Sequence, residues 1–219
     1  MQPEKSSFWR RNGLSIVVLV LMLGSLLGQA IAGHDVYNRE LSELGGSPLS
    51  LREYLISGHF VSATFENWES EFLQMGMYVL LTVVLRQKGS AESRPMSEAE
   101  EHERIEPGPT PWPVRAGGLW KTLYGHSLAI CFGLLFALSF ALHLDGSWRR
   151  ELGERLLKGE PPIALADYLA DSQFWFESFQ NWQSEFLAVI ALVVLSIWLR
   201  QKDSPQSKPL RAPHSQTGV

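Results

Sequence analysis

Two long apolar runs dominate the pattern of hydrophobic and polar positions along the chain. Residues 12–33 carry no charged side chain, and residues 122–144 carry none apart from two histidines. Each run is long enough to cross the hydrocarbon core of a bilayer, which is about 30 Å thick and needs about 20 apolar residues in a helix. The runs therefore predict membrane-spanning helices and exclude a simple water-soluble globule.

An internal repeat is the second pattern. Residues 54–90 and 168–204 align without a gap, and 17 of the 37 positions are identical. Residues 8–41 match 119–152 more weakly. The best matches are polar and aromatic, as in the strings NWESEFL and NWQSEFL, so chance similarity between apolar helices does not explain them. We therefore predict two copies of one unit, in which an apolar helix, a polar loop and a second helix follow one another.

The second helix of each copy has a shorter charge-free core. Residues 72–85 and 186–199 are free of charge, which is a length also typical of buried soluble helices and interfacial segments. Aromatic, weakly charged sequence precedes each core, and Trp68 and Trp182 would lie in the outer aromatic belt of a membrane. We therefore expect these two segments to span the membrane as well.

Charge sets the predicted orientation. With the amino terminus inside, the inner segments hold 13 Lys and Arg residues and the outer loops hold 6, as the positive-inside rule requires. We therefore predict an all-α protein with four transmembrane helices in two parallel repeats, and with both termini in the cytoplasm. The predicted parts are repeat 1 over 1–88 (helices at about 12–33 and 62–87), a disordered acidic, Pro-rich linker over 89–118, repeat 2 over 119–202 (helices at about 119–144 and 174–201) and a disordered tail over 203–219. The outer loops are expected to be partly helical around 36–44, 49–57 and 148–158.

The amino-terminal segment also has the features of a cleaved signal peptide. Basic residues precede the first apolar run, and Ala30-Ile31-Ala32 fits a small-residue cleavage site. The equivalent segment of the second copy is internal, however, and cannot be a signal. We therefore expect the first helix to be retained.

Small residues recur at every fourth position on both long apolar runs. Such stripes let helix backbones approach closely, which favours helix packing in lipid. We expect the two stripes to pack on each other or to form a homodimer interface, and the sequence leaves both open. The residues are Gly24, Gly28 and Ala32 on the first run, and Ala129, Gly133, Ala137 and Ala141 on the other.

Two Asn–Glu pairs in the repeated motif are the candidate functional residues. Glu71 and Glu185 lie near the outer edge of the hydrocarbon core, about 22 Å along a helix from the inner arginines. Asn67 and Asn181 lie one turn further out on the same face. Packed around a pseudo-two-fold axis, the two carboxylates would share a proton or bind a cation. Alternatively, the four side chains fasten the outer loops to the helix ends.

Other candidate chemistry is sparse. The histidines at 34, 59, 126 and 143 match no haem or metal ligand spacing, and we expect them to make interfacial hydrogen bonds. We predict no metal, no cofactor and no catalytic residue, because no phosphate loop, metalloprotease or nucleophile motif indicates an enzyme. A single cysteine, Cys131, excludes an intramolecular disulfide, and a formal net charge of −4 argues against a nucleic-acid partner.

Several strings also resemble a bacterial multi-pass membrane family that is classed only as a domain of unknown function. They include YLISGHF at 54–60, FENWESEFLQM at 65–75 and FWFESFQNWQSEFL at 174–187. The resemblance covers most of the chain outside the linker and tail. It implies a bacterial inner-membrane protein, but it implies no activity, substrate or cofactor.

Two functions follow as hypotheses. The first is a structural or interaction protein of the cell envelope, whose aromatic and acidic outer loops dock an envelope protein. The second is a small channel or transporter that uses Glu71 and Glu185 and works as a homo-oligomer, because four helices enclose little space. Besides the lipid bilayer, the expected partners are thus another copy of the chain or an envelope protein.

Overall fold

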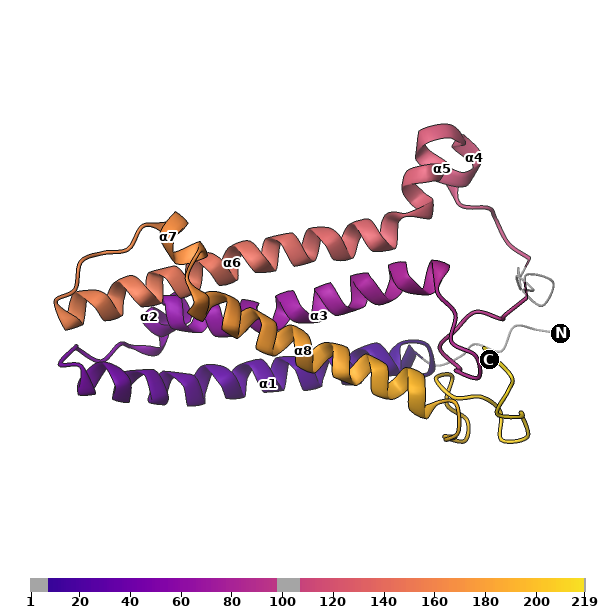
Figure 1. The fold of residues 1–219 in the computed structure, drawn as a ribbon, viewed down its shortest axis with the longest axis horizontal. Helices are drawn as coiled ribbons and strands as arrows, with labels where there is room; N and C mark the ends of the chain where they lie inside the picture. The colour runs from indigo at the N-terminus through magenta and orange to yellow at the C-terminus, as the bar shows by residue number, and fades with distance from the viewer. Residues whose placement is uncertain (1–7, 98–106, 219) are drawn as a thin grey trace. The chain divides into compact units, whose positions relative to one another are not determined.

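The computed structural model describes residues 8–97 and 107–218. Over these residues the chain forms eight α-helices and no strand, which confirms the predicted all-α class (Figure 1). Residues 1–7, 98–106 and 219, including the start of predicted repeat 1, the middle of the predicted linker and the end of the predicted tail, lie outside the described residues. The helices are α1 (Phe8–Glu43), α2 (Leu51–Leu55), α3 (Gly58–Val84), α4 (Trp112–Ala116), α5 (Gly118–Gly125), α6 (Ser127–Lys158), α7 (Leu165–Leu169) and α8 (Ser172–Leu195).

The helices belong to two compact units. Unit 1 consists of the described parts of Met1–Ala63 together with Asp145–Tyr168. Unit 2 consists of the described parts of Thr64–Leu144 together with Leu169–Val219. α3 and α6 each contribute one end to unit 1 and the remainder to unit 2, so this division cuts across the predicted repeats.

In unit 1, α1 is longer than the apolar run that predicts it. A polar sequence without proline follows the run at 12–33, so the helical hydrogen bonds continue to Glu43. Gly45, with a φ of 76°, ends the helix, and the Gly46 N–H donates to the Leu41 carbonyl at 2.7 Å. The outer-loop helices expected at 36–44 and 148–158 are therefore present, but as direct extensions of α1 and α6.

The loop from α1 to α2 is held by hydrogen bonds to its backbone. The Leu49 N–H donates to Asn38 Oδ1 at 2.7 Å, and the Leu49 carbonyl accepts from Asn38 Nδ2 at 3.0 Å. Ser50 then caps α2, which buries Tyr54. The Tyr54 hydroxyl packs on Gly33 so closely that a Cβ atom at Gly33 would lie 2.2 Å from it.

A backbone contact in unit 1 joins the first turn of α3 to α6. A Cβ atom on Gly58 would lie 2.5 Å from the Gly146 carbonyl oxygen, and one on Gly146 would lie 2.5 Å from the Ser62 nitrogen. No side chain fits between the two helices at this point. Glycine at both positions is therefore what allows the approach.

Two helices, α5 and α6, take the place of the single helix predicted at 119–144, and the short α4 precedes them. α4 has Pro113 in its first turn, where the missing N–H needs no partner, and Gly117 separates α4 from α5. α5 ends at Gly125, a residue type that weakens a helix, and His126 caps it. α6 then begins at Ser127 and runs to Lys158. α4 lies within the linker 89–118 that we expected to be disordered.

Other parts of the expected linker and tail also have defined contacts in unit 2. Ser90 Oγ and Ser196 Oγ are hydrogen-bonded at 2.9 Å. The Lys208 ammonium group is buried and donates to four backbone carbonyls, those of Gly89, Pro213, His214 and Gln216. Polar composition predicts disorder, but one ammonium group that satisfies several carbonyls holds these turns together.

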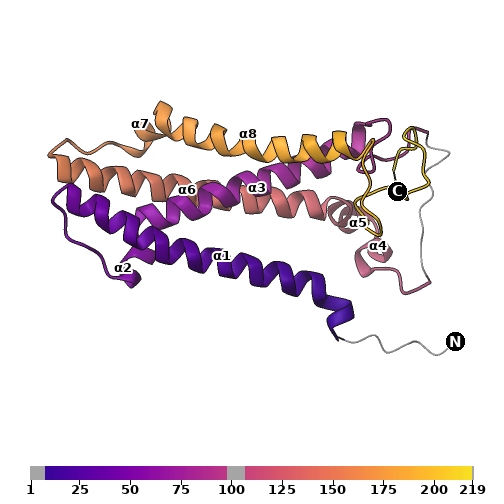
Figure 2. The same cartoon turned by 90° about the horizontal axis from the view of Figure 1, so that it is seen from below.

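α8 lies along α3 in unit 2 and runs in the same direction (Figure 2). Hydrogen bonds join residue 66 to 181, 69 to 182 and 74 to 185, so the partners advance together along both helices. In addition, α7 and α8 begin 114 residues after α2 and α3, which is the offset of the sequence repeat.

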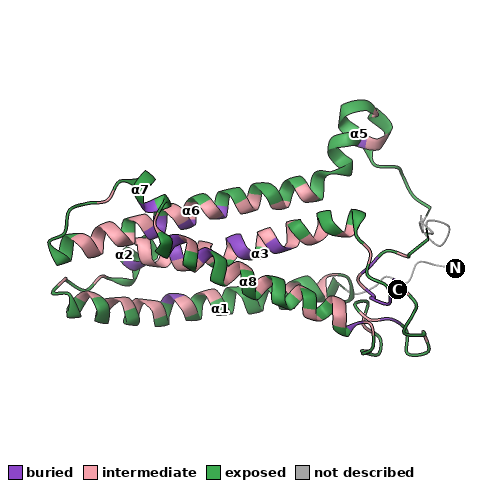
Figure 3. Ribbon diagram, viewed as in Figure 1, coloured by how far each residue is buried: buried purple, intermediate pink, exposed green. Residues whose placement is uncertain are grey.

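Burial is distributed in the opposite way to that of a water-soluble bundle. Among the described residues, 13 polar or charged side chains are buried but only five apolar ones. Large apolar side chains are exposed along α1, α3, α6 and α8, as the green stretches in Figure 3 show. α1 and α6 are long and apolar enough to cross a membrane, and only 6% and 11% of their most apolar stretches are buried.

Candidate functional site

A buried carboxylate–imidazole pair joins α3 to α6 in unit 2. Glu69 on α3 and His143 on α6 are both fully buried, and His143 Nδ1 lies 3.1 Å from Glu69 Oε2. A carboxylate that is taken out of water needs partners for both of its oxygens. Trp182 on α8 supplies the second partner, because its Nε1–H donates to Glu69 Oε1 at 3.1 Å. Three helices thus position one carboxylate.

Aromatic rings hold the imidazole in place. The fully buried Phe174 ring lies with its centroid 5.0 Å from that of His143. Phe140, one turn before His143 on α6, packs edge-on against the same phenylalanine at 5.7 Å. With Glu69 accepting from Nδ1–H, the ring has a fixed orientation and a fixed tautomer, in which Nε2 is the atom with a lone pair.

Two further carboxylates surround the imidazole. Glu66 on α3 and Glu177 on α8 are half-buried. One carboxylate oxygen of each and a ring nitrogen of His143 all lie within 4.8 Å of one another. Asn181 Nδ2 donates to Glu66 Oε1 and to the Glu177 backbone carbonyl, so it orients Glu66. We call Glu66, Glu69, His143 and Glu177 the buried cluster.

Helix periodicity explains how these residues meet. Glu66 and Glu69 are three positions apart on α3, and Glu177 and Asn181 are four apart on α8, so each pair shares one helix face. Because α3 and α8 run in the same direction, these faces oppose each other over a full turn. α6 contributes His143 to the same place. The buried cluster therefore needs three helices that are distant in sequence.

The structure brings the two predicted carboxylates together. Glu71 and Glu185 lie near each other, as expected for equivalent positions on parallel helices. Glu71 is exposed, however, and Glu185 is half-buried. Asn67 is also exposed, and Asn181 contacts Glu66 rather than the predicted pair. Whether these four residues bind a proton or a cation, or fasten the loops, stays a prediction.

Among the described residues, the glycines of the predicted small-residue stripes have no close neighbour from another helix. No atom of the described chain lies within 4 Å of the Cβ position of Gly24, Gly28 or Gly133. The close helix contact uses Gly58 and Gly146 instead. Stripe packing, including the homodimer alternative, therefore stays a prediction.

Unit 1 contains a separate cluster of aromatic side chains. The buried Tyr54 has its hydroxyl 3.2 Å from His59 Nδ1, and the rings of Tyr37 and His59 stack at 4.6 Å. His34 packs edge-on against Tyr54 at 5.7 Å. Burial lowers the pKa of His59 below its usual value, an effect that the nearby Arg150 adds to and Glu40 opposes. Burial likewise raises the pKa of Tyr37.

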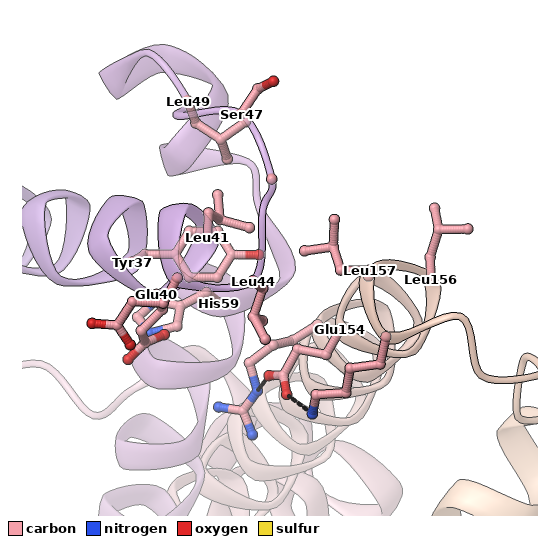
Figure 4. A pocket seen from close by; sticks show the side chains of 15 residues that line it. Tyr37, Glu40, Leu41, Leu44, Ser47, Leu49, His59, Glu154, Leu156 and Leu157 are labelled. Carbon is pink, nitrogen blue, oxygen red and sulfur yellow. Dashed lines mark hydrogen bonds and ion pairs between the residues drawn. The ribbon is translucent and has the colours of Figure 1, made fainter.

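A cavity of about 710 Å³ adjoins this cluster in unit 1 (Figure 4). Glu154, labelled in Figure 4, lies between two cations, with Arg150 Nε at 3.9 Å and Lys158 Nζ at 3.3 Å. Tyr37 and several leucines form the apolar part of its wall. The mixed lining fits an amphipathic segment rather than a small ion.

We predict that acidic pH destabilises unit 1 through His59. Its pKa is lower in the folded chain than the unfolded value of about 6.5, so it stabilises the fold above that pH. This contribution falls as the pH drops below about 6.5 and is lost once the folded His59 is protonated as well. Nδ1 of the neutral ring can accept a hydrogen bond from the Tyr54 hydroxyl, whereas Nδ1 of the protonated ring cannot.

The measurement is the thermal unfolding midpoint of the purified chain at several pH values. As the pH is lowered, this midpoint should fall less steeply for His59→Gln, which carries the residue of the aligned position 173, than for the wild type. Equal slopes for the two proteins would contradict this assignment.

A sequence profile described as a domain of unknown function, DUF6766, matches residues 5–219. The chain belongs to this family. No curated protein and no solved structure matches the chain. The membership agrees with the resemblance to a family of unknown function, and it assigns no role to the buried cluster.

The buried cluster contains residues that we did not select from the sequence. Glu66, Glu69 and Glu177 had no predicted role, Trp182 was expected to lie in the outer aromatic belt, and His143 was expected only to make interfacial hydrogen bonds. A signal was present in the repeat, because the aligned positions of Glu66, Glu69, Glu177 and His143 are Gln180, Gln183, Ala63 and Ala32. Each of these ionisable residues occurs in one copy only, so the scaffold that the two copies share does not require it.

Proposed function

We propose that the chain is a multi-pass membrane protein with four crossings that handles a proton or a cation at the buried cluster, as a small channel or transporter. The observation that carries the proposal is the reversed polarity: ionisable and hydroxyl side chains lie inside, while apolar side chains face outward. Large exposed apolar surfaces need a partner that is not water, and a bilayer supplies one along whole helices.

The lengths of α3 and α8 support four crossings. They have 27 and 24 residues, so they extend about 40 and 36 Å at 1.5 Å per residue, which exceeds a hydrocarbon core of about 30 Å. Glu69 on α3 is turned to the inside, so it does not oppose insertion as a lipid-facing charge would. The parallel direction of α3 and α8 also agrees with like-oriented repeats and with two cytoplasmic termini.

The cluster supports an active role rather than a purely structural one. An ionisable side chain within a membrane domain is expensive to bury, and such residues usually mark an ion or proton path. Here three carboxylates and one imidazole converge from α3, α6 and α8. An excess of acids over bases of this kind favours a bound cation or an added proton. Catalysis is not part of the proposal.

The test is proton and cation flux into liposomes that contain the purified chain. We expect flux above that of empty liposomes, and a decrease of about tenfold or more in Glu69→Gln, because the change removes the central charge but keeps the shape. Glu160→Gln is the matched control, because this carboxylate is half-exposed and lies outside the cluster. Reporter fusions in the same cells should place Gly89 and the carboxyl terminus on the cytoplasmic face. Absence of flux, or flux equal in both variants, contradicts the proposed activity, and Gly89 and the carboxyl terminus on opposite faces contradict the four crossings.

A second candidate function is docking of an envelope protein. The cavity of unit 1 favours it, because a space of about 710 Å³ with leucines and paired charges suits a peptide segment. This function predicts that Leu157→Arg abolishes co-purification of an envelope protein with the chain, whereas Glu69→Gln preserves it. The channel or transporter function predicts that Glu69→Gln lowers proton or cation flux, whereas Leu157→Arg does not.

A further inference from the structure

We propose that the buried cluster is a binding site for one divalent first-row transition-metal ion, with Glu66, His143 and Glu177 as its ligands. This inference rests on the proposed function and deepens it by naming the cation. It reverses our expectation from the sequence that no metal is bound. The site would take Zn²⁺, Mn²⁺ or Fe²⁺ rather than an alkali cation.

The geometry of the three ligand atoms fits such an ion. They lie within 4.8 Å of one another, and they come from α3, α6 and α8. An ion with metal–ligand bonds of about 2.0–2.2 Å holds its ligand atoms about 3.0–4.4 Å apart. Rotation of the half-buried Glu66 and Glu177 side chains brings the ligand atoms into this range.

Glu69 does not bind the ion in this proposal, but it accepts the hydrogen bond that orients the His143 imidazole. A metal-binding histidine almost always donates its second N–H to a carboxylate or carbonyl, which fixes the ring and makes the coordinating nitrogen more basic. His143 donates from Nδ1 to Glu69 at 3.1 Å, and Trp182 holds the other oxygen of the same carboxylate. Nε2 is then the ring atom that coordinates the ion.

The donor set also selects the class of ion. One imidazole nitrogen and two carboxylate oxygens suit Zn²⁺, Mn²⁺ and Fe²⁺, whereas Mg²⁺ and Ca²⁺ prefer oxygen ligands alone. A divalent ion offsets the charge of Glu66 and Glu177 in a poorly hydrated place. Asn181 orients Glu66 through a hydrogen bond, as outer partners of ligating carboxylates do.

The repeat provides independent support. The positions aligned with Glu66, His143 and Glu177 hold Gln180, Ala32 and Ala63. Glu66 belongs to the first copy, whereas His143 and Glu177 belong to the second. At each position the other copy carries an amide or a methyl side chain, so the scaffold that the copies share does not need these ionisable groups.

The experiment measures metal binding by the full chain in nanodiscs after removal of metal with a chelator. Zn²⁺ and Co²⁺ are the probes, with calorimetry for affinity, elemental analysis for stoichiometry and the visible absorption of bound Co²⁺ as a spectroscopic readout. We expect one ion per chain, an affinity at least 100-fold weaker in His143→Gln, and an affinity about 10–100-fold weaker in Glu69→Gln, as for other outer partners. Affinity should also fall at acidic pH, because the ligands must lose their protons. His126→Gln is the matched control, because this histidine is exposed and lies between α5 and α6.

The outcomes separate this inference from the proposed function. Folded wild type that binds no stoichiometric Zn²⁺, or His143→Gln that binds like wild type, overturns the metal site. If flux still depends on Glu69 in that case, the proposed proton function stands without the metal. If metal binds but no flux occurs, the metal site stands and the channel or transporter function fails. Should His143→Gln not fold, X-ray absorption of Zn²⁺-loaded wild type and of Glu177→Gln decides, because the first must show an imidazole ligand and the second must lose a carboxylate ligand.

Discussion

Replacement of Glu69 by leucine should destabilise the chain by about 2–6 kcal/mol, because a carboxylate that accepts two hydrogen bonds in the folded chain is lost. The carboxylate accepts from His143 Nδ1 and from Trp182 Nε1, both at 3.1 Å. Leucine fills a similar volume but accepts no hydrogen bond. Two buried donors on α6 and α8 would then lose their acceptor, and each such loss costs about 1–3 kcal/mol. Reversible unfolding in mixed micelles, followed by tryptophan fluorescence, measures the change.

Two further variants make this prediction specific. Glu69→Gln keeps one acceptor oxygen, so its loss of stability should be smaller than that of Glu69→Leu. Glu160→Gln alters a half-exposed carboxylate, where the ion pair with Arg155 at 3.7 Å contributes about 0–1 kcal/mol. A Glu69→Leu protein as stable as wild type would mean that the buried pair does not hold α3, α6 and α8 together.

Replacement of Gly146 by valine should lower stability by about 3 kcal/mol, at the upper end of typical overpacking effects. A Cβ atom at Gly146 would lie 2.5 Å from the Ser62 backbone nitrogen, and the atom it meets cannot rotate away. α3 and α6 must then separate at the point where Gly58 and Gly146 now let their backbones touch. The midpoint of thermal unfolding in detergent reports this loss.

A glycine on the same helix serves as the control. No described atom lies within 4 Å of the Cβ position of Gly133, so Gly133→Ala meets no obstacle. Alanine is favoured over glycine inside a helix by about 0.5–1 kcal/mol, and this variant should be neutral or slightly stabilised. If Gly133→Ala is destabilised as much as Gly146→Val, the helix contact at Gly58 and Gly146 is not the cause, and Gly133 itself contacts a partner such as a second copy.

The local features of the fold could be predicted from the sequence. The first long apolar run lies within α1 and most of the second lies within α6, and the repeat places α7 and α8 at the same offset from α2 and α3. These features depend on residues close together in the chain: uninterrupted apolar sequence for a helix, and Ser50 with Glu53 for a helix start. The residues at which the helices begin and end were less predictable. The polar ends of α1 and α6 stay helical because nothing in their sequence breaks the hydrogen-bond ladder, whatever their polarity.

The candidate site could be predicted only in part. Glu71 and Glu185 meet because equivalent positions on parallel helices face each other, which the repeat indicated. The buried cluster instead joins residues that are not equivalent, Glu69 and His143, 74 positions apart. Periodicity describes the faces of one helix, but not which face of another helix lies opposite.

By itself, the sequence determined the helices, their repeat and the strongly apolar character of α1 and α6, because hydrophobicity and backbone hydrogen bonding act between near neighbours. Only the tertiary structure decided which polar groups are buried. Glu69 is adjacent in the chain to the half-buried Trp68, yet it is enclosed because α6 brings an imidazole and α8 brings an indole N–H to its carboxylate. A charge can leave water only where several helices supply its partners at once, and that condition exists only in the folded chain.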